Sequence, residues 1–192
     1  MTLLIVGLVL FLGIHSTAIV SPGWRDGMVE KLGEGPWKGL YSIVSFLGLG
    51  LIIYGWSQAR LSPTLVWLPP VGMRHAVLLF MLPVFPLLAA SYLPGRIRNA
   101  AGGHPMLLSV KFWAFSHLLA NGYLHEMVTF GAFLAWAIAD RISLKRRKGP
   151  MPKPAPDGMR NDLIAAGVGL ALYAVTIVWA HQWLFGVAPV AM

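Results

Sequence analysis

Six long apolar stretches constrain this sequence more than any other feature. Their approximate ranges are 2–20, 40–57, 75–93, 106–122, 125–142 and 163–185. A bilayer core about 30 Å thick requires about 20 mainly apolar residues in helical form. Apolar and polar residues do not alternate with a period of two in these stretches, so the pattern does not indicate a β-barrel. Because a helix satisfies its own backbone hydrogen bonds in lipid, we expect an all-α integral membrane protein with six transmembrane helices. All 192 residues are expected to form one transmembrane domain.

The composition supports this class and restricts the chemistry. Apolar residues make up 57% of the chain and charged residues only 11%, whereas a soluble domain carries about 25% charged residues. The absence of cysteine excludes disulfides, iron–sulfur clusters, thiolate metal sites and cysteine nucleophiles. A bound metal must therefore use His, Met, Asp or Glu.

Basic residues are distributed unevenly between the apolar stretches, which predicts an orientation. The segments after the second and fourth stretches contain only Arg60 and Arg74. Those after the first, third and fifth contain Arg25, Lys31, Lys38, Arg96, Arg98, Arg141, Lys145, Arg146, Arg147, Lys148, Lys153 and Arg160. Positive residues concentrate on the cytoplasmic side, so we expect a multi-pass protein of the bacterial inner membrane with both termini non-cytoplasmic. The net charge of +8 then faces anionic membrane lipid rather than nucleic acid.

Several local patterns predict how the spans begin, bend and connect. The segment 2–20 has neither a charged n-region nor an A-x-A cleavage site, which favours a retained helix over a signal peptide. Pro83 and Pro86 predict a kink in the third span. The four residues 121–124 predict a tight antiparallel pair of the fourth and fifth spans. A proline-rich cytoplasmic linker is expected at about 143–162.

Histidines are the strongest candidates for functional residues. His75, His125 and His181 lie near span ends on the expected non-cytoplasmic side, where an imidazole can reach headgroups and water. His15 and His117 instead have apolar turns on both sides, and an ionisable group inside a membrane is by default a functional-site hypothesis. A single buried histidine can simply hydrogen-bond a carbonyl or hydroxyl group.

Two such histidines on different spans are the ligand set of a six-coordinate haem b. A non-haem metal is the alternative. Such a metal would need further ligands, and Glu126 and Asp140 are the only carboxylates within the spans. The third possibility is a pair of interhelical hydrogen bonds with no cofactor.

The fourth span contains the other candidate cofactor contacts. At 100° per residue, His104 and His117 lie about 140° apart, so one straight helix cannot direct both into one pocket. Trp113 shares a face with His117. Lys111 lies on the other face, where it can snorkel or meet a haem propionate. In the expected topology His15 and His117 differ in depth by about 9 Å, and depth alone favours His104 as the partner of His15.

Three sequence elements resemble a known family. They are FLGIHSTAI, GEGPWKGLYSIVSFLGLGLIIYGW, and GHPMLLSVKFWAFSHLLANG followed by AIADR. Together they resemble the NnrU family of membrane proteins linked to denitrification. They are also similar to the plant and cyanobacterial 15-cis-zeta-carotene isomerases, which carry haem b. The resemblance covers about residues 3 to 145.

The resemblance implies specific roles. The proposed axial ligands of the isomerases correspond to His15 and His117, the first histidine of the HP…H element corresponds to His104, and an acidic–basic pair corresponds to Asp140 and Arg141. The isomerases have W-C-x-x-H and R-H-P where this chain has WAFSH and GHP. These departures affect transfer of the isomerase activity more than transfer of the haem.

The resemblance therefore implies an inner-membrane haem b protein of NnrU type, acting in nitrogen-oxide metabolism. Two protein ligands leave no open iron position, which favours electron transfer or redox sensing. One alternative is an enzyme, a haem-dependent cis-trans isomerase of a carotenoid-like polyene taken up from lipid. The other is a cofactor-free assembly factor or transporter. The substrate, the redox partner and the oligomeric state do not follow from the sequence.

Overall fold

The computed structural model describes residues 1–146 and 158–189, and its elements there are helices. They form two compact units. Unit 1 comprises Met1–Leu68 and Gly122–Arg147, and unit 2 comprises Pro69–Asn121 and Lys148–Met192. Each unit thus joins segments that are distant in the sequence.

Unit 1 contains five helices. They are α1 (Thr2–His15), α2 (Thr17–Val20), α3 (Pro22–Leu32), α4 (Glu34–Ala59) and α9 (Leu124–Arg146). Unit 2 contains the remaining described elements. They are α5 (Met73–Met81), α6 (Val84–Ala90), α7 (Arg96–Ala100), α8 (Pro105–Ala120), α10 (Met159–Val175), the π-helical turn η1 (Thr176–Ala180) and α11 (His181–Phe185).

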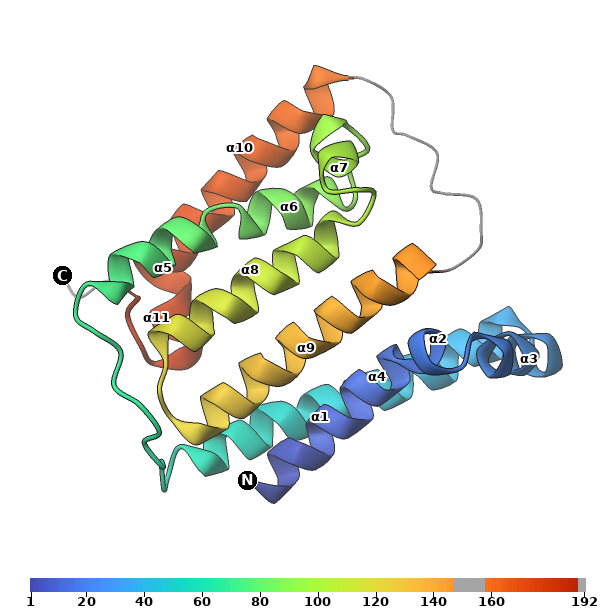
Figure 1. Ribbon diagram of the computed structural model, residues 1–192, viewed down its shortest axis with the longest axis horizontal. Coiled ribbons are helices and arrows are strands. Elements are labelled where there is room, and N and C mark those ends of the chain that lie inside the picture. Colours follow the sequence, from blue (N-terminus) through green and yellow to red (C-terminus); the bar gives the residue numbers. More distant parts are fainter. Residues whose placement is uncertain (147–157, 190–192) are drawn as a thin grey trace. The chain divides into compact units, whose positions relative to one another are not determined.

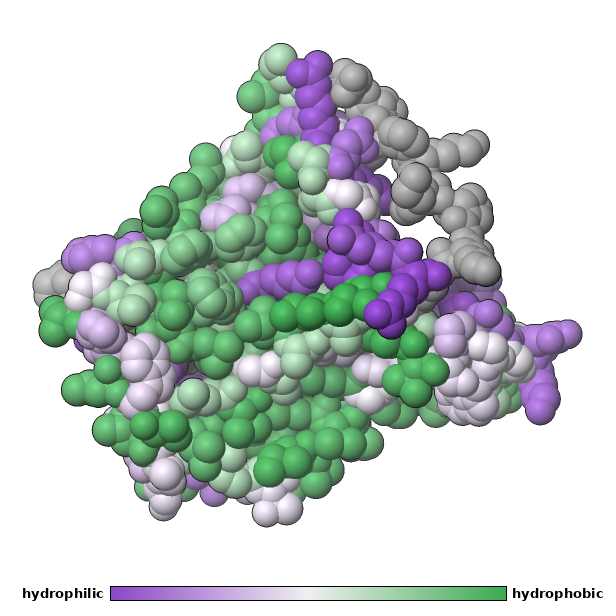
Figure 2. Space-filling view, viewed as in Figure 1, coloured by the Kyte–Doolittle hydropathy of each residue, from purple (hydrophilic) through white to green (hydrophobic). Residues whose placement is uncertain are grey.

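Within the described residues, four helical segments are long and apolar enough to cross a membrane. They are Glu34–Ala59, Met73–Ala90, Leu124–Arg146 and Met159–Phe185. Thr2–His15 and Pro105–Ala120 are apolar but shorter, so the six-span topology stays a prediction. Figure 2 shows apolar side chains along the outer surfaces of the helices; Phe46 and Leu79, for example, are 73% and 69% exposed. Outward-facing apolar side chains on long helices are typical of a membrane protein.

Glycines bring α1 and α4 into close contact in unit 1, where the two helices run side by side (Figure 1). A Cβ atom at Gly48 would lie 2.7 Å from the backbone nitrogen of Phe11, and one at Gly7 would lie 2.6 Å from that of Ile52. Leu4, Leu8 and Ile52 form the buried core of this helix pair. Small residues at such contacts let the two backbones approach closely, which is how membrane helices pack.

Backbone hydrogen bonds join the segment after α4 to the start of α9 in unit 1. The amide of Val66 donates to the carbonyl of Gly122 at 2.8 Å, and the amide of Leu124 donates to the carbonyl of Thr64 at 2.9 Å. The segment after α4 is therefore attached to the start of α9. The predicted pairing of the fourth and fifth spans concerns α8 and α9, which belong to different units, and it stays a prediction.

The predicted proline interruption of the third span is confirmed, because α5 ends at Met81 and α6 begins at Val84. Neighbouring helices bond the carbonyl groups around the break. Tyr173 on α10 donates its hydroxyl to the carbonyl of Leu78 at 2.6 Å, and Ser109 on α8 donates to that of Val84 at 2.8 Å. Such donors make a break tolerable in a medium without water.

The start of α10 holds α7 in place. The two carboxylate oxygens of Asp162 each lie 3.0 Å from a backbone amide, one of Arg96 and one of Ile97, and accept a hydrogen bond from each. These are two of the amides that the first turn of a helix leaves without intrahelical partners.

The helix ends differ from the sequence expectation. The second span begins at Glu34 instead of about 40, α9 continues to Arg146 instead of ending at about 142, and α10 begins at Met159 instead of about 163. Apolar windows detect the lipid-facing part of a helix, whereas the helix itself continues through polar residues. The segment after the first span also contains an unpredicted helix, α3. Of the linker expected at about 143–162, residues 143–146 and 159–162 belong to α9 and α10, and residues 147–157 lie outside the described residues.

Candidate functional site

His15 ends α1 at the point where the helix is interrupted before α2. Its Nδ1 atom lies 2.6 Å from the carbonyl oxygen of Phe11, one turn earlier. A carbonyl oxygen only accepts hydrogen bonds, so in the neutral ring Nδ1 carries the proton and Nε2 carries the lone pair. Metal-binding histidines commonly have this second contact, which fixes the tautomer. His15 is thus in the form that coordinates a metal through Nε2.

Aromatic rings from three helices surround the His15 ring. The ring centroids lie 4.3 Å from Phe11, 5.1 Å from Tyr41 on α4 and 6.0 Å from Trp136 on α9. The Trp136 indole nitrogen, Nε1, is buried and has no hydrogen-bond partner within the described part of the chain. A buried donor without an acceptor costs about 1–3 kcal/mol. A ligand with an acceptor atom beside His15 would remove that cost.

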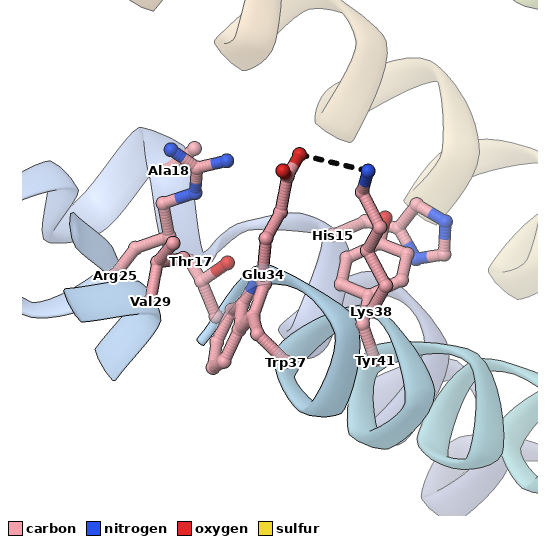
Figure 3. Close-up of a pocket in the computed structure, with 9 residues that line it drawn as sticks. All are labelled: His15, Thr17, Ala18, Arg25, Val29, Glu34, Trp37, Lys38 and Tyr41. Atoms are coloured by element: carbon pink, nitrogen blue, oxygen red, sulfur yellow. Dashed lines mark ion pairs between the residues drawn. The ribbon is translucent and has the colours of Figure 1, made fainter. Parts of the chain in front are cut away.

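A hollow of about 660 Å³ lies beside His15 in unit 1. Figure 3 shows Arg25, Glu34 and Lys38 extending from α3 and α4 on the same side. Lys38 pairs with Glu34 at 2.8 Å and Arg25 pairs with Asp26 at 2.8 Å, and all four side chains are substantially exposed. The hollow is lined by His15, Thr17, Ala18, Arg25, Val29, Glu34, Trp37, Lys38 and Tyr41. It therefore combines a metal-competent imidazole, aromatic surface and two cations.

Folding of the segment after α1 creates this hollow. Gly33 has a φ of 85°, a backbone conformation that favours glycine, and it connects α3 to α4. Trp24 on α3 packs edge-on against Trp37 on α4, with ring centroids 5.9 Å apart. The turn and the ring contact hold Arg25 close to the first turns of α4.

His117 has the same local contact in unit 2. It lies in the last turn of α8, and its Nδ1 atom is 2.8 Å from the carbonyl oxygen of Trp113. The same argument assigns the proton to Nδ1 and the lone pair to Nε2. The Trp113 ring lies against the imidazole, with centroids 5.4 Å apart. Both predicted ligands thus show the same tautomer-fixing bond to the carbonyl four residues earlier.

His181 also belongs to the surroundings of His117, which the sequence analysis missed. The two imidazoles are nearly parallel, with centroids 6.4 Å apart and planes 23° apart. The Nδ1 atom of His181 lies 2.7 Å from the carbonyl oxygen of Val187, which follows a left-handed turn at Gly186. The π-helical turn η1 directly before His181 changes the helical register, and π-turns often occur at functional sites. Apolar periodicity does not reveal such a turn.

A family model for NnrU proteins matches residues 3–189, nearly the whole chain. The chain belongs to the NnrU family. This confirms the resemblance found in the sequence. No curated protein and no solved structure matches the chain.

Two of the elements that resemble the NnrU family meet at the hollow. His15 comes from the first element. Glu34, Trp37, Lys38 and Tyr41 come from the second, where they occupy the first two turns of α4. In this NnrU protein, residues about 20 positions apart therefore line one cavity.

The other predicted site residues of this NnrU protein occupy α8 and its start. His104 is the N-cap residue of α8, and at 1.5 Å per residue it lies about 20 Å along the helix axis from His117. The two histidines therefore lie at opposite ends of α8. Lys111 and Trp113 lie between them, and Lys111 is partly buried.

The remaining histidines divide into one exposed and one buried residue. His75 is exposed at the start of α5. The expectation that His125 reaches water is wrong, because its side chain is 3% exposed and lies against Trp56, with ring centroids 5.0 Å apart. It lies near the end of a span, but the packing of α4 and α9 encloses it.

Carboxylates do not complete a non-haem metal site in the described residues. Across 1–146 and 158–189 no group of three or more His, Asp or Glu side chains is arranged to hold a metal. Glu126 instead accepts a hydrogen bond from the amide of Tyr123 at 3.1 Å, and Asp140 interacts electrostatically with Tyr41.

Proposed function

We propose that this NnrU-family membrane protein binds haem b and that His15 and His117 would bind its iron. The observation that carries the proposal is the shared Nδ1–carbonyl contact, at 2.6 Å for His15 and 2.8 Å for His117. Both imidazoles are thereby held in the tautomer whose Nε2 can bind iron. When bound, the haem would supply the remaining ligand atoms of its iron.

The surroundings of His15 fit a haem edge. Tyr41, Phe11 and Trp136 present aromatic surface to a flat apolar ring, and the hollow lies within the range of about 300–1,000 Å³ typical of cofactor sites. The buried indole N–H of Trp136 supports a ligand with an acceptor atom. When bound, haem b supplies one-electron chemistry.

The proposed role is electron transfer or redox sensing in nitrogen-oxide metabolism at the bacterial inner membrane. If both His15 and His117 bind the iron, the bound haem would favour electron transfer or redox sensing over activation of a small ligand. The protein would hold the cofactor in lipid-facing helices, with α1 extended by α2 and with α8 as the two shorter spans of a six-helix topology.

The second ligand has one competitor, His104. The tautomer-fixing contact supports His117, whereas the depth argument from the expected topology supports His104, which begins the fourth span on the cytoplasmic side. Since the two lie about 20 Å apart along α8, only one of them can share an iron with His15. Single substitutions separate the two assignments.

The decisive experiment is a dithionite-reduced minus oxidised absorbance spectrum of protein purified from haem-replete membranes. We expect a low-spin b-type spectrum, lost or converted to high spin in His15→Ala and in His117→Ala. His75→Ala is the matched control, because His75 is exposed at the start of α5, and its spectrum should equal that of the wild type. A colourless wild-type protein would refute the proposal, and loss of the spectrum in His104→Ala but not in His117→Ala would reassign the second ligand.

A further inference from the structure

The hollow beside His15 contains charged side chains that iron binding by His15 alone does not require. His15 and Tyr41 line it, and their ring centroids are 5.1 Å apart. Arg25 and Lys38 also line the hollow, and their side chains are 45% and 70% exposed. A ligand that filled the hollow would therefore meet an imidazole, aromatic surface and two cations that are partly exposed, with Lys38 beside His15 and Arg25 on the far side of Glu34 (Figure 3).

The present partners of these cations are exchangeable. Asp26 and Glu34 are 65% and 74% exposed, and exposed ion pairs contribute little to stability. Either acid can return to water at little cost when another carboxylate reaches its cation. Arginine in particular binds carboxylates through two parallel hydrogen bonds. The two pairs thus keep the cations in place without blocking an anionic ligand.

We infer that Arg25 and Lys38 bind the two propionate carboxylates of the haem whose iron is bound by His15. This inference rests on the proposed function and adds which side of the cofactor meets α3 and the first turns of α4, namely the side that carries the propionates. It replaces the expectation that Lys111 on α8 meets a propionate. Arg25 and Lys38 are positioning residues, because they contact the cofactor away from the iron.

The test compares haem with haem dimethyl ester, in which both propionates are neutral. Each is titrated by its Soret absorbance into full-length apo-protein from haem-deficient cells, reconstituted in lipid nanodiscs. The wild type should bind haem about tenfold more tightly than the ester. In Arg25→Gln/Lys38→Gln that preference should fall to about one, because two partly exposed charge-assisted bonds together contribute roughly this factor. Affinity for the ester should not change.

Lys31→Gln is the matched control, because Lys31 is an exposed cation of the same helix α3 that does not line the hollow. It should keep the wild-type preference. Equal weakening of haem and ester in the double variant would indicate a general effect on the membrane surface and would overturn the inference. So would a wild type that binds both ligands equally, although the haem proposal would then still stand. A wild type that binds neither would overturn both.

Discussion

The imidazole rings of His117 and His181 lie nearly parallel in unit 2, with centroids 6.4 Å apart. Each ring is tied through Nδ1 to a different backbone carbonyl, His117 to Trp113 and His181 to Val187. His181, which the sequence suggested to be an interfacial residue near the end of a span, therefore packs against His117, a proposed iron ligand.

His181→Ala should keep the low-spin haem spectrum, because the ring is proposed to pack beside His117 and not to bind iron. The absorbance spectrum of the purified variant measures this directly. His117→Ala should lose the low-spin spectrum. If His117→Ala stays low-spin and the double variant His117→Ala/His181→Ala does not, His181 has taken the ligand position.

Gly48→Ala should destabilise unit 1 by about 1–3 kcal/mol, the usual cost of overpacking. Its new Cβ would lie 2.7 Å from the backbone nitrogen of Phe11, whose carbonyl also holds His15. The free energy of unfolding in mixed detergent micelles measures the effect. Gly50→Ala on the same helix is the control, because a Cβ there meets nothing within 4 Å. Equal effects of the two substitutions would contradict the close α1–α4 contact.

Gly169→Ala should loosen α10 from α6 in unit 2, because a Cβ at Gly169 would collide with the backbone of Pro86. Backbone atoms next to a proline break cannot move aside as a flexible side chain can. We therefore expect the free energy of unfolding to fall by about 1–3 kcal/mol. Thermal unfolding of the purified protein reports it. Gly167→Ala faces open space and should leave the midpoint unchanged. A stable Gly169→Ala protein would show that the two helices can separate freely.

The expected orientation can be tested with single cysteines, since the chain has none of its own. Val71→Cys, at a position 93% exposed, should react with a membrane-impermeant maleimide on intact spheroplasts. Lys31→Cys on α3 should react only after permeabilisation, because the positive segments are expected in the cytoplasm. The reverse labelling pattern would invert the topology.

The isomerase alternative makes a separate prediction. If the protein transfers electrons, its expression in a carotenoid-producing host that lacks its own zeta-carotene isomerase should not restore all-trans product. Pigment analysis of the cells measures the outcome, with a functional isomerase as the positive control. Restored all-trans product would favour the enzyme.

Sequence patterns predicted much of the local structure. The apolar stretches located the helices, Pro83 and Pro86 located the break between α5 and α6, and apolar flanks singled out His15 and His117. Of the small residues that could permit close helix contacts, Gly48 and Gly169 make them, whereas Gly50 and Gly167 meet nothing. These four residues are chemically identical, so only the direction that each faces distinguishes them.

The sequence by itself determined the class of protein, its helices and the histidines that carry the functional hypothesis, because hydropathy and proline act locally along the chain. Only the tertiary structure decided what surrounds those histidines. The fold back through α3 brings Arg25 and Lys38 to the hollow of His15, and the π-helical turn η1 precedes the His181 ring that lies beside His117. Such neighbours depend on turns and on the rotational register of packed helices, which residue composition along one segment does not encode.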